Sequence, residues 1–276
     1  MRNAYPPIAD HGLIGDLQTA ALVATDGTID WYCCPRFDSP SVFAALLDHN
    51  RGGHFQIAPE EQGYVTKQLY FPDSAILITR FMAPSGVGEV IDFMPIDRPE
   101  RATEHHQIFR MVRVVRGTMR FALECAPRFN YGRLAHELSV VERGAVFRSP
   151  SLTLTLHASM PLEQHNQDVH ATFTLNAGEI AGVILESAAE GPPHGISPDE
   201  VREIAWRTAD YWRAWLDRST YDGRWREIVQ RSAMTLKLMI YAPTGAPVAA
   251  ITAGLPEDMG GERNWDYRFT WIRDAS

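Results

Sequence analysis

The sequence has few cysteines, no cluster of basic residues and no long apolar run. Among its 276 residues are three cysteines, two of them the neighbours Cys33 and Cys34, which does not make a disulfide framework. The formal net charge is -8, and phosphate binding needs a basic surface. No apolar stretch approaches membrane-spanning length, and residues 1–7 lack the apolar core of a signal peptide. We therefore expect a cytoplasmic protein that binds neither nucleic acid nor a membrane.

Common motifs for metals, phosphate and nucleophilic catalysis are also missing. His105 and His106 are neighbours, and on a strand they would point to opposite faces, so they could not share one ion. His136 has no second histidine four residues later, as a zinc-protease helix requires. Gly86 and Gly88 fit a hairpin turn better than a phosphate-binding loop. The sequence therefore predicts no metal site and no cofactor.

The region between residues 53 and 186 consists of short segments typical of β-strands, with turn signals such as Arg116-Gly117 between them. No helical pattern separates these segments, which favours a mainly β fold: a large antiparallel two-sheet sandwich with more strands than a seven-stranded domain. The expected strands cover residues 75–81, 89–94, 108–115, 118–125, 140–147, 152–156, 169–175 and 180–185.

Two helices are expected after a change in composition near residue 190. Ser197 and Glu200 form a capping box with Pro198 at the first helical position, and apolar residues follow at three- and four-residue spacing. A second apolar stripe runs from Trp225 to Ile240, with Pro243 as the expected end of its helix. A shorter helix is expected at residues 42–47. The predicted parts are a sandwich domain (residues 1–190), a helical linker (191–220) and a second helical region (221–276).

Residues 264–276, here called the closing segment, contain the densest pattern of aromatic and charged side chains. Trp265, Tyr267, Phe269 and Trp271 alternate with polar residues. The apolar face of a pyranose stacks on such rings, and its vicinal hydroxyls suit forked carboxylate and guanidinium groups. The same alternation is also typical of a half-buried strand. From composition alone, a sugar site and a strand are equally good readings.

A catalytic pair of carboxylates is not identified near the closing segment. Glycoside hydrolysis requires two carboxyl groups, one of them an acid with a raised pKa. Arginines in the same stretch would instead favour the ionised state, so these carboxylates fit hydrogen bonding to sugar hydroxyls better than proton transfer. The carboxylates concerned are Glu257, Asp258, Glu262, Asp266 and Asp274.

Three stretches together resemble the bacterial and archaeal branch of glycoside hydrolase family 15, which contains glucoamylases, glucodextranases and trehalases. Residues 5–41 (YPPIADHGLIGD, DGTIDW and PRFDSPS) resemble the start of the family's trehalase-like N-terminal domain. Residues 221–246 (YDGRWRE, RSAMTLK and YAPTGA) resemble the first helix of its catalytic domain. Residues 264–275 (NWDYRFTWIRDA) resemble its sugar-binding loop. The resemblance implies a β super-sandwich, a helical linker and the first helix of a truncated (α/α)6 barrel.

The resemblance also implies roles for residues of the closing segment. Trp271 would wall the subsite of the glucose being cleaved, Arg273 and Asp274 would bind its hydroxyls, and Tyr267 would line the same pocket. The family's catalytic glutamates lie further along the barrel, and no position of this sequence matches them. Separately, the polar and aromatic loop that contains Arg36 and Asp38 is a possible rim of the site.

The expected function is hydrolysis of α-glucosidic bonds, of glucoamylase or trehalase type and with inversion, by a longer protein of which this chain is a part. Alone, the chain is expected to be inactive. The alternatives are a non-catalytic carbohydrate-binding domain and a structural scaffold. The expected partner is an α-glucoside or oligosaccharide. Exposure of Trp225, Ile228, Leu236 and Met239 on the helical tail would favour a homo-oligomer.

Overall fold

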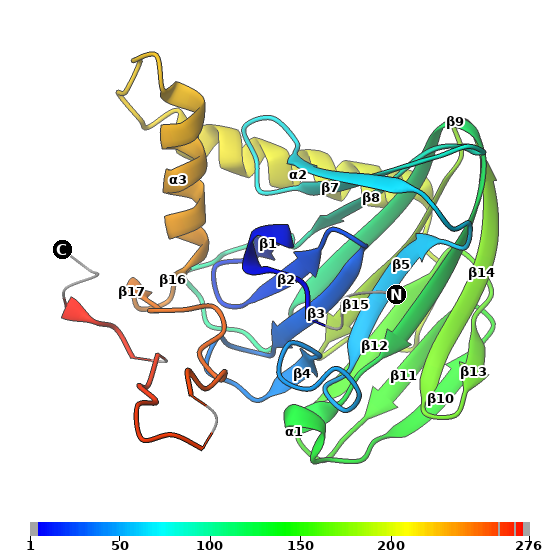
Figure 1. Cartoon of the computed structure of the whole chain (residues 1–276), viewed down its shortest axis with the longest axis horizontal. Helices are drawn as coiled ribbons and strands as arrows, with labels where there is room; N and C mark the ends of the chain where they lie inside the picture. The colour runs from blue at the N-terminus through cyan, green and yellow to red at the C-terminus, as the bar shows by residue number, and fades with distance from the viewer. Residues whose placement is uncertain (1–4, 259, 268, 273–276) are drawn as a thin grey trace.

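The computed structural model describes residues 5–258, 260–267 and 269–272. Figure 1 shows a large β structure with two helices against one end and the C-terminal part of the chain beside the strands nearest the N-terminus. Two antiparallel sheets make up the β structure, and they share one long strand. The mainly β fold and the sandwich predicted from alternation are confirmed.

Strands from the first third of the chain form most of the first sheet, which the shared strand β9 completes together with a later hairpin. Its members are β1 (His11–Gly15), β2 (Ala20–Ala24), β3 (Thr28–Cys33), β4 (Ser41–Ala44), β5 (His54–Pro59), β9 (Gln107–Ala126), β13 (Glu163–His165) and β14 (Asp168–Asn176). Residues 42–47 were expected to be helical, and that expectation is wrong. β4 occupies the start of this stretch and pairs with β3, so sheet pairing outweighs the local preference.

The second sheet packs against the first and is built from hairpins on both sides of β9. Its other members are β6 (Val65–Tyr70), β7 (Leu77–Ala83), β8 (Gly86–Phe93), β10 (Glu137–Val141), β11 (Gly144–Arg148), β12 (Thr153–Ala158) and β15 (Ile180–Ser187). A small separate hairpin, β16 (Ile240–Tyr241) with β17 (Ala246–Pro247), follows the helices, and a 3-10 turn (Ile8–Asp10) precedes β1.

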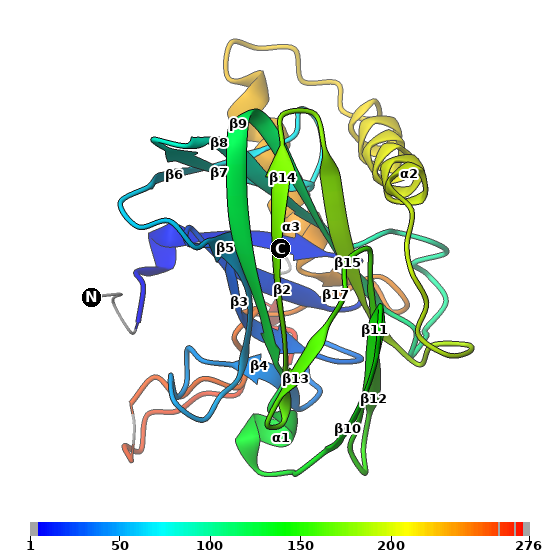
Figure 2. The same ribbon diagram turned by 90° about the vertical axis from the view of Figure 1, so that its right-hand side faces the viewer.

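Strand β9 passes from one sheet to the other, and Figure 2 shows it running through the height of the molecule. Its first part pairs with β15 in the second sheet, and residues from Thr118 onward pair with β14 in the first. Between these parts Gly117 has a φ of +78°, a conformation that favours glycine. The turn predicted at Arg116-Gly117 is therefore wrong: the pair bends a continuous strand, as happens where a strand turns a sandwich corner.

A buried ion pair joins β9 to its neighbour β8. Arg110 is fully buried, and its Nε donates to Asp92 Oδ1 at 2.8 Å. Its other nitrogens donate to the carbonyl oxygens of Phe55 (2.5 Å) and Gly27 (2.7 Å). Burial raises the pKa of the Asp92 carboxyl, and the charge of Arg110 opposes that rise. Because every nitrogen of the guanidinium has an acceptor, the core tolerates this charge.

Helix α2 (Pro198–Leu216) lies along the second sheet, and α1 (Phe129–Gly132) is a single turn between strands. Ser197 caps α2 by accepting a hydrogen bond from the backbone nitrogen of Glu200 at 3.1 Å, so the predicted start of this helix is confirmed. Its predicted apolar face is also confirmed, because Val201, Thr208, Trp212 and Leu216 are among its buried residues. No helix within the described ranges is long and apolar enough to cross a membrane.

Helix α3 (Arg226–Leu238) packs on the rest of the molecule with a face other than its apolar stripe. Its buried residues are Gln230, Met234 and Leu238, whereas Trp225, Ile228 and Leu236 are exposed and Met239 is half-buried. The helix ends at Leu238 rather than near Pro243, because the β16–β17 hairpin begins two residues later. The exposure expected for Trp225, Ile228 and Leu236 is therefore confirmed, whereas Met239 is only partly exposed.

The turn between β1 and β2 connects the sandwich to these helices. Leu17 at its tip has a φ of +72° and is fully buried in a cluster with Trp212 of α2 and Met234 of α3. Its carbonyl oxygen accepts a hydrogen bond from the Ala242 nitrogen at 2.8 Å, just beyond β16. A non-glycine residue in this conformation is uncommon and persists where the surroundings impose it. The turn thus fixes the helical pair against the sandwich.

Candidate functional site

The described part of the closing segment is irregular and lies beside the β16–β17 hairpin. Its residues at 264–267 and 269–272 form no strand, so the strand reading of this pattern is wrong. The rings of Tyr267 and Trp271 stack with an interplanar angle of 2° and centroids 5.8 Å apart. Thr270 Oγ1 donates to the carbonyl oxygen of Pro247 at 2.9 Å. Arg273 and Asp274 lie outside the described residues.

The loop of residues 35–40, here called the rim loop, lies next to the closing segment. Arg36 binds Asp38 with both Nε and Nη2, each 2.9 Å from a carboxylate oxygen. This hydrogen bond and the charge of Asp38 raise the pKa of Arg36. Both residues line a cavity of about 170 Å³ together with Tyr241 and Thr270. The structure therefore brings the predicted rim residues and the closing segment to one place.

A larger groove, here called the junction groove, opens between the sandwich and the C-terminal part of the chain. Its volume of about 640 Å³ falls within the usual range for small-molecule pockets. Asp38 lines it as well as the smaller cavity, so the two hollows share one wall. The lining residues are Asp38, Pro40, Leu47, Tyr131, Arg133, Ala253, Gly254, Leu255, Pro256, Asn264, Trp265 and Asp266.

Two contacts seat residues 251–255 on the sandwich and so form the groove floor. Trp31 of β3 is fully buried, and its Nε1 donates to the carbonyl oxygen of Ile251 at 3.0 Å. Ile251 and Leu255 pack into the same apolar cluster as Trp31 and Tyr131. Gly254 passes so close to Tyr131 that a Cβ there would lie 2.5 Å from the Tyr131 hydroxyl oxygen. A side chain at position 254 would therefore displace the Tyr131 ring.

The side chain of Asn264 organises the loop that carries the first aromatics of the closing segment. Its Oδ1 accepts from the Asp258 nitrogen at 3.0 Å, and its Nδ2 donates to the carbonyl oxygens of Asp258 (2.8 Å) and Gly261 (3.1 Å). Because both the oxygen and the nitrogen of its amide bond to the loop backbone, Asn264 stabilises this loop. Trp265 directly follows it and leaves 62% of its surface exposed.

The α1 turn supplies the opposite wall of the groove in a strained conformation. Asn130 and Tyr131 have φ values of 51° and 59°, in the left-handed region. Such residues cost about 1–3 kcal/mol each and are found most often at functional sites. The Tyr131 nitrogen donates to Ser41 Oγ at 3.1 Å, which helps hold the turn. Sequence reasoning missed this wall, although Asn130 and Gly132 are residue types that tolerate the left-handed region.

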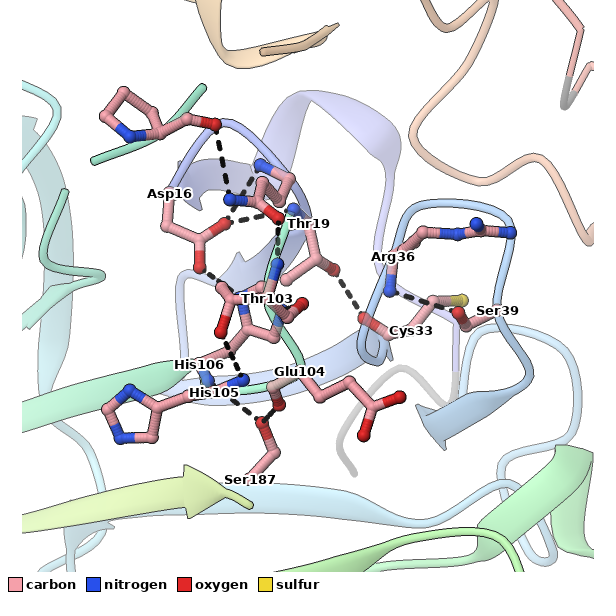
Figure 3. Close-up of polar contacts among 12 residues, drawn as sticks. Asp16, Thr19, Cys33, Arg36, Ser39, Thr103, Glu104, His105, His106 and Ser187 are labelled. Carbon is pink, nitrogen blue, oxygen red and sulfur yellow. Dashed lines mark hydrogen bonds and ion pairs between the residues drawn. The ribbon is translucent and has the colours of Figure 1, made fainter. Parts of the chain in front are cut away.

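A polar network behind the rim loop fixes its position (Figure 3). His106 Nδ1 lies 2.5 Å from Asp16 Oδ2, and His106 Nε2 lies 3.1 Å from the carbonyl oxygen of Thr103. Burial opposes protonation of His106, but the hydrogen bond and charge of Asp16 raise its pKa above the usual value. Asp16 Oδ1 in turn accepts from the backbone nitrogens of Gln18 and Thr19, both at 3.0 Å.

The same turn reaches the rim loop through the main chain. The Phe37 nitrogen donates to the carbonyl oxygen of Gln18 at 3.2 Å, and Thr19 Oγ1 donates to the carbonyl oxygen of Cys33. Within the rim loop, Ser39 Oγ accepts from the Arg36 nitrogen at 3.0 Å. The buried His106–Asp16 pair therefore stabilises the turn to which the rim loop is hydrogen-bonded.

Among the described residues, the carboxyl groups whose pKa is raised lie within the sandwich. The described carboxyl groups with a raised pKa are Asp30 and Asp92, and burial in the sandwich raises both. Asp30 is bound to His11 and Asp92 to Arg110, so each has a structural partner. Among the described residues, no group of three or more histidine, cysteine, aspartate or glutamate side chains could hold a metal ion.

Fold and site together define a large antiparallel sandwich joined to a helical unit, with an aromatic and polar groove at the junction. The chain belongs to the family described as trehalase-like, N-terminal, whose model matches residues 2–188. The model of glycosyl hydrolases family 15 matches residues 223–276. These matches confirm the family resemblance found from the three sequence stretches.

Several trehalases are similar to this chain over nearly all of its length. That of Mycobacterium tuberculosis is 36% identical over 301 residues, which cover 100% of this chain and 44% of the relative. The Thermoplasma volcanium trehalase is 36% identical over 279 residues, covering 99% of this chain and 44% of the relative. The chain thus spans less than half the length of these relatives. Among solved structures, a kojibiose phosphorylase from the human microbiome matches with a TM-score of 0.49 and 8% identity, covering 86% of this chain and 40% of that one.

Proposed function

We propose that this chain is part of a trehalase-type glycoside hydrolase that cleaves an α-glucosidic bond of a small glucoside with inversion. The observation that carries the proposal is the placement of the closing segment. This segment contains the stacked Tyr267–Trp271 pair and also supplies Asn264, Trp265 and Asp266 to the lining of the junction groove. Paired aromatic rings beside forked polar groups suit a pyranose. The similarity to trehalases over nearly the whole chain supports the same reading.

In this proposal the chain comprises a sandwich domain (residues 1–190), a helical linker (191–220) and the start of an (α/α)6 catalytic domain (221–276). The family matches to residues 2–188 and 223–276 support these boundaries, and α2 occupies the interval between them. The buried Leu17 turn then serves as the fixed joint between the two domains.

The proposed roles of the site residues follow from their chemistry and from the resemblance. Trp271 and Tyr267 wall the subsite of the glucose that is cleaved, and Arg273 and Asp274 bind its hydroxyls. Arg36 and Asp38 form the rim, where their bidentate pair presents fixed polar atoms. The acid and base that break the bond are carboxylates outside this chain, so the chain alone binds sugar without hydrolysing it.

The experiment that tests the proposal has two parts. Glucose release from trehalose, maltose and isomaltose is measured with the 276-residue chain and with a longer protein that continues into the barrel. We expect activity only in the longer protein, and Trp271→Ala in that protein should lower kcat/KM by about 100-fold or more. Trp206→Ala changes a tryptophan of α2 that packs on Phe71 and lines neither hollow of the site, so it is the matched control and should retain activity. Hydrolysis by the purified 276-residue chain, or full activity of Trp271→Ala, would contradict the proposal.

A second candidate function is a non-catalytic carbohydrate-binding or scaffold domain, favoured by the absence of an acid–base pair among the described residues of the groove. Calorimetric titration separates this function from the first: a longer protein that binds glucosides saturably but hydrolyses none of them would establish it.

Self-association through the outward face of α3 is a further part of the proposal, because Trp225, Ile228 and Leu236 form an exposed apolar surface.

A further inference from the structure

The junction groove has a composition that the proposed cleavage subsite does not explain. Residues of the sandwich form one wall, among them Asp38, Tyr131 and Arg133, and residues of the C-terminal part form the other. Trp265, which lies in the second wall, is 62% exposed, although a large aromatic side chain normally loses most of its surface on folding. A ring held open on a structured loop is suited to stacking on a ligand.

Arg133 is an exposed cation that lines the groove. Its backbone is fixed by bonds from its nitrogen to the carbonyl oxygens of Phe129 and Asn130, both 3.1 Å long. Its side chain is exposed, and within the described ranges its guanidinium has no hydrogen bond or ion pair to another residue. A guanidinium with five N–H donors therefore lines the groove from a backbone that is itself held in place.

The charges of the groove favour a neutral ligand rich in hydroxyl groups. Asp38 is already neutralised by Arg36, and the remaining charged members, Arg133 and Asp266, are of opposite sign. An anionic ligand would meet two carboxylates, whereas a sugar offers hydroxyls to both signs of charge and an apolar face to the indole. The apolar floor formed by Leu47 and Leu255 suits the same apolar face.

We infer that the junction groove is a second sugar subsite, in which Trp265 stacks on one glucosyl unit while Arg133 and Asp38 bind its hydroxyls. This inference rests on the proposed function and goes beyond it. The sandwich then takes part in substrate recognition, and the unit in the groove is a different one from the glucose held by Trp271. The strained α1 turn is a positioning element, because it presents Arg133 to the groove.

The two subsites can be observed separately by NMR. The chain has seven tryptophans, so a spectrum of the 15N-labelled protein shows one indole signal for each. Trp265→Phe and Trp271→Phe identify the two signals concerned. During titration with trehalose and with maltotriose, we expect the Trp265 signal to move saturably. Arg133→Ala should weaken this response about tenfold, as expected for the loss of a charge-assisted hydrogen bond.

Matched variants distinguish ligand binding in the groove from general effects of charge and folding on the titration. Arg148→Ala removes another exposed arginine, at the end of β11, and should leave the titration unchanged. Arg133→Lys keeps the charge without the fork and should bind at an intermediate level if the protein folds. A Trp265 signal that stays still while that of Trp271 moves would overturn the inference and leave the proposed function in place. Movement of Trp265 alone would support the groove and contradict the proposed role of Trp271, and no movement of either signal overturns both.

Discussion

The indole nitrogen of Trp31 donates a hydrogen bond to the carbonyl oxygen of Ile251, 3.0 Å away, although the two residues are 220 positions apart in the chain. The bond joins the third strand of the sandwich to the segment that forms the groove floor. Trp31 is fully buried, so its indole nitrogen cannot exchange this bond for one with water. The shape of the groove therefore depends on the sandwich core.

Trp31→Phe should loosen the groove floor more than it destabilises the whole protein. The substitution keeps an aromatic ring but removes the donor to the Ile251 carbonyl, at a cost of about 0.5–1.5 kcal/mol. Hydrogen exchange of the amides in residues 251–258 should accelerate, while exchange in β9 should change little. Trp206→Phe, at a half-exposed site on α2, is the control. Equal acceleration in both variants would contradict this role of Trp31.

Asp92→Ala should be among the most destabilising single substitutions in the sandwich. It would leave the fully buried Arg110 without its carboxylate, and breaking a buried pair in this way costs about 3–5 kcal/mol. Urea unfolding followed by circular dichroism measures the loss. The double variant Arg110→Met with Asp92→Leu removes both charges and should recover most of the stability. A double variant as unstable as Asp92→Ala would show that the pair is not the cause.

The stability contributed by His106 should fall as the pH rises. Its folded-state pKa is raised above the usual 6.5: burial opposes this rise, but the hydrogen bond to Asp16 outweighs that effect. A raised pKa means that the contribution is fully present below about pH 6.5 and is lost as pH rises through the folded pKa. The free energies of unfolding of the parent and of His106→Gln, measured in urea, should differ by about 1.5–3 kcal/mol at pH 6 and converge in alkaline buffer. A difference that grows with pH would contradict the assignment.

Glu186 should give the opposite dependence at low pH. Although burial alone would raise its pKa, hydrogen bonds from His157 and His105 lower it from 4.5 to about 2. A lowered pKa contributes stability above the unfolded value, and this stability is lost as pH falls from about 4.5 towards 2. Glu186→Gln should therefore flatten the acid limb of the stability curve. Acid titration followed by tryptophan fluorescence measures the midpoint, and an unchanged limb would rule out this contribution.

The outward face of α3 should drive self-association of the 276-residue chain. Ile228 and Leu236 are 66% and 63% exposed, and adjacent exposed apolar residues favour contact with another molecule. Light scattering should give a mass above that of a monomer, and Ile228→Glu with Leu236→Glu should reduce it. Val141→Glu changes an exposed apolar residue of β10 and should leave the mass unchanged. A parent chain that is monomeric at high concentration would contradict this prediction.

Much of the fold is encoded in local patterns. Alternation between residues 53 and 186 predicted strands because one side of a strand faces the core and the other side does not. The capping box at Ser197 predicted the start of α2, since an oxygen there can bind an otherwise unsatisfied helix nitrogen. Both features depend on neighbours close in sequence, so a single sequence is sufficient to recognise them.

Features that depend on distant partners were missed or misread. Arg116-Gly117 has the composition of a turn, and only the different partners on each side of it make it a bend inside β9. The apolar stripe of α3 gave no sign that Met234 and Leu238 would face inward, because Leu17 and α2 decide that orientation. Periodicity shows that a helix has an apolar face, but not which surface that face meets.

At the candidate site, too, features that depend on residue type differ from features that depend on distant partners. The residue types of the closing segment alone left a sugar site and a strand as equal alternatives, because rings and forked charges suit pyranoses but also alternate as in a half-buried strand. Only tertiary structure placed Asp38, Tyr131 and Arg133 of the sandwich opposite Trp265. That arrangement depends on the Trp31–Ile251 bond, the left-handed turn at Tyr131 and the close approach of Gly254, which are contacts between segments far apart in the chain. Side-chain chemistry is a property of the sequence, whereas the groove exists only where the packed core brings its walls together.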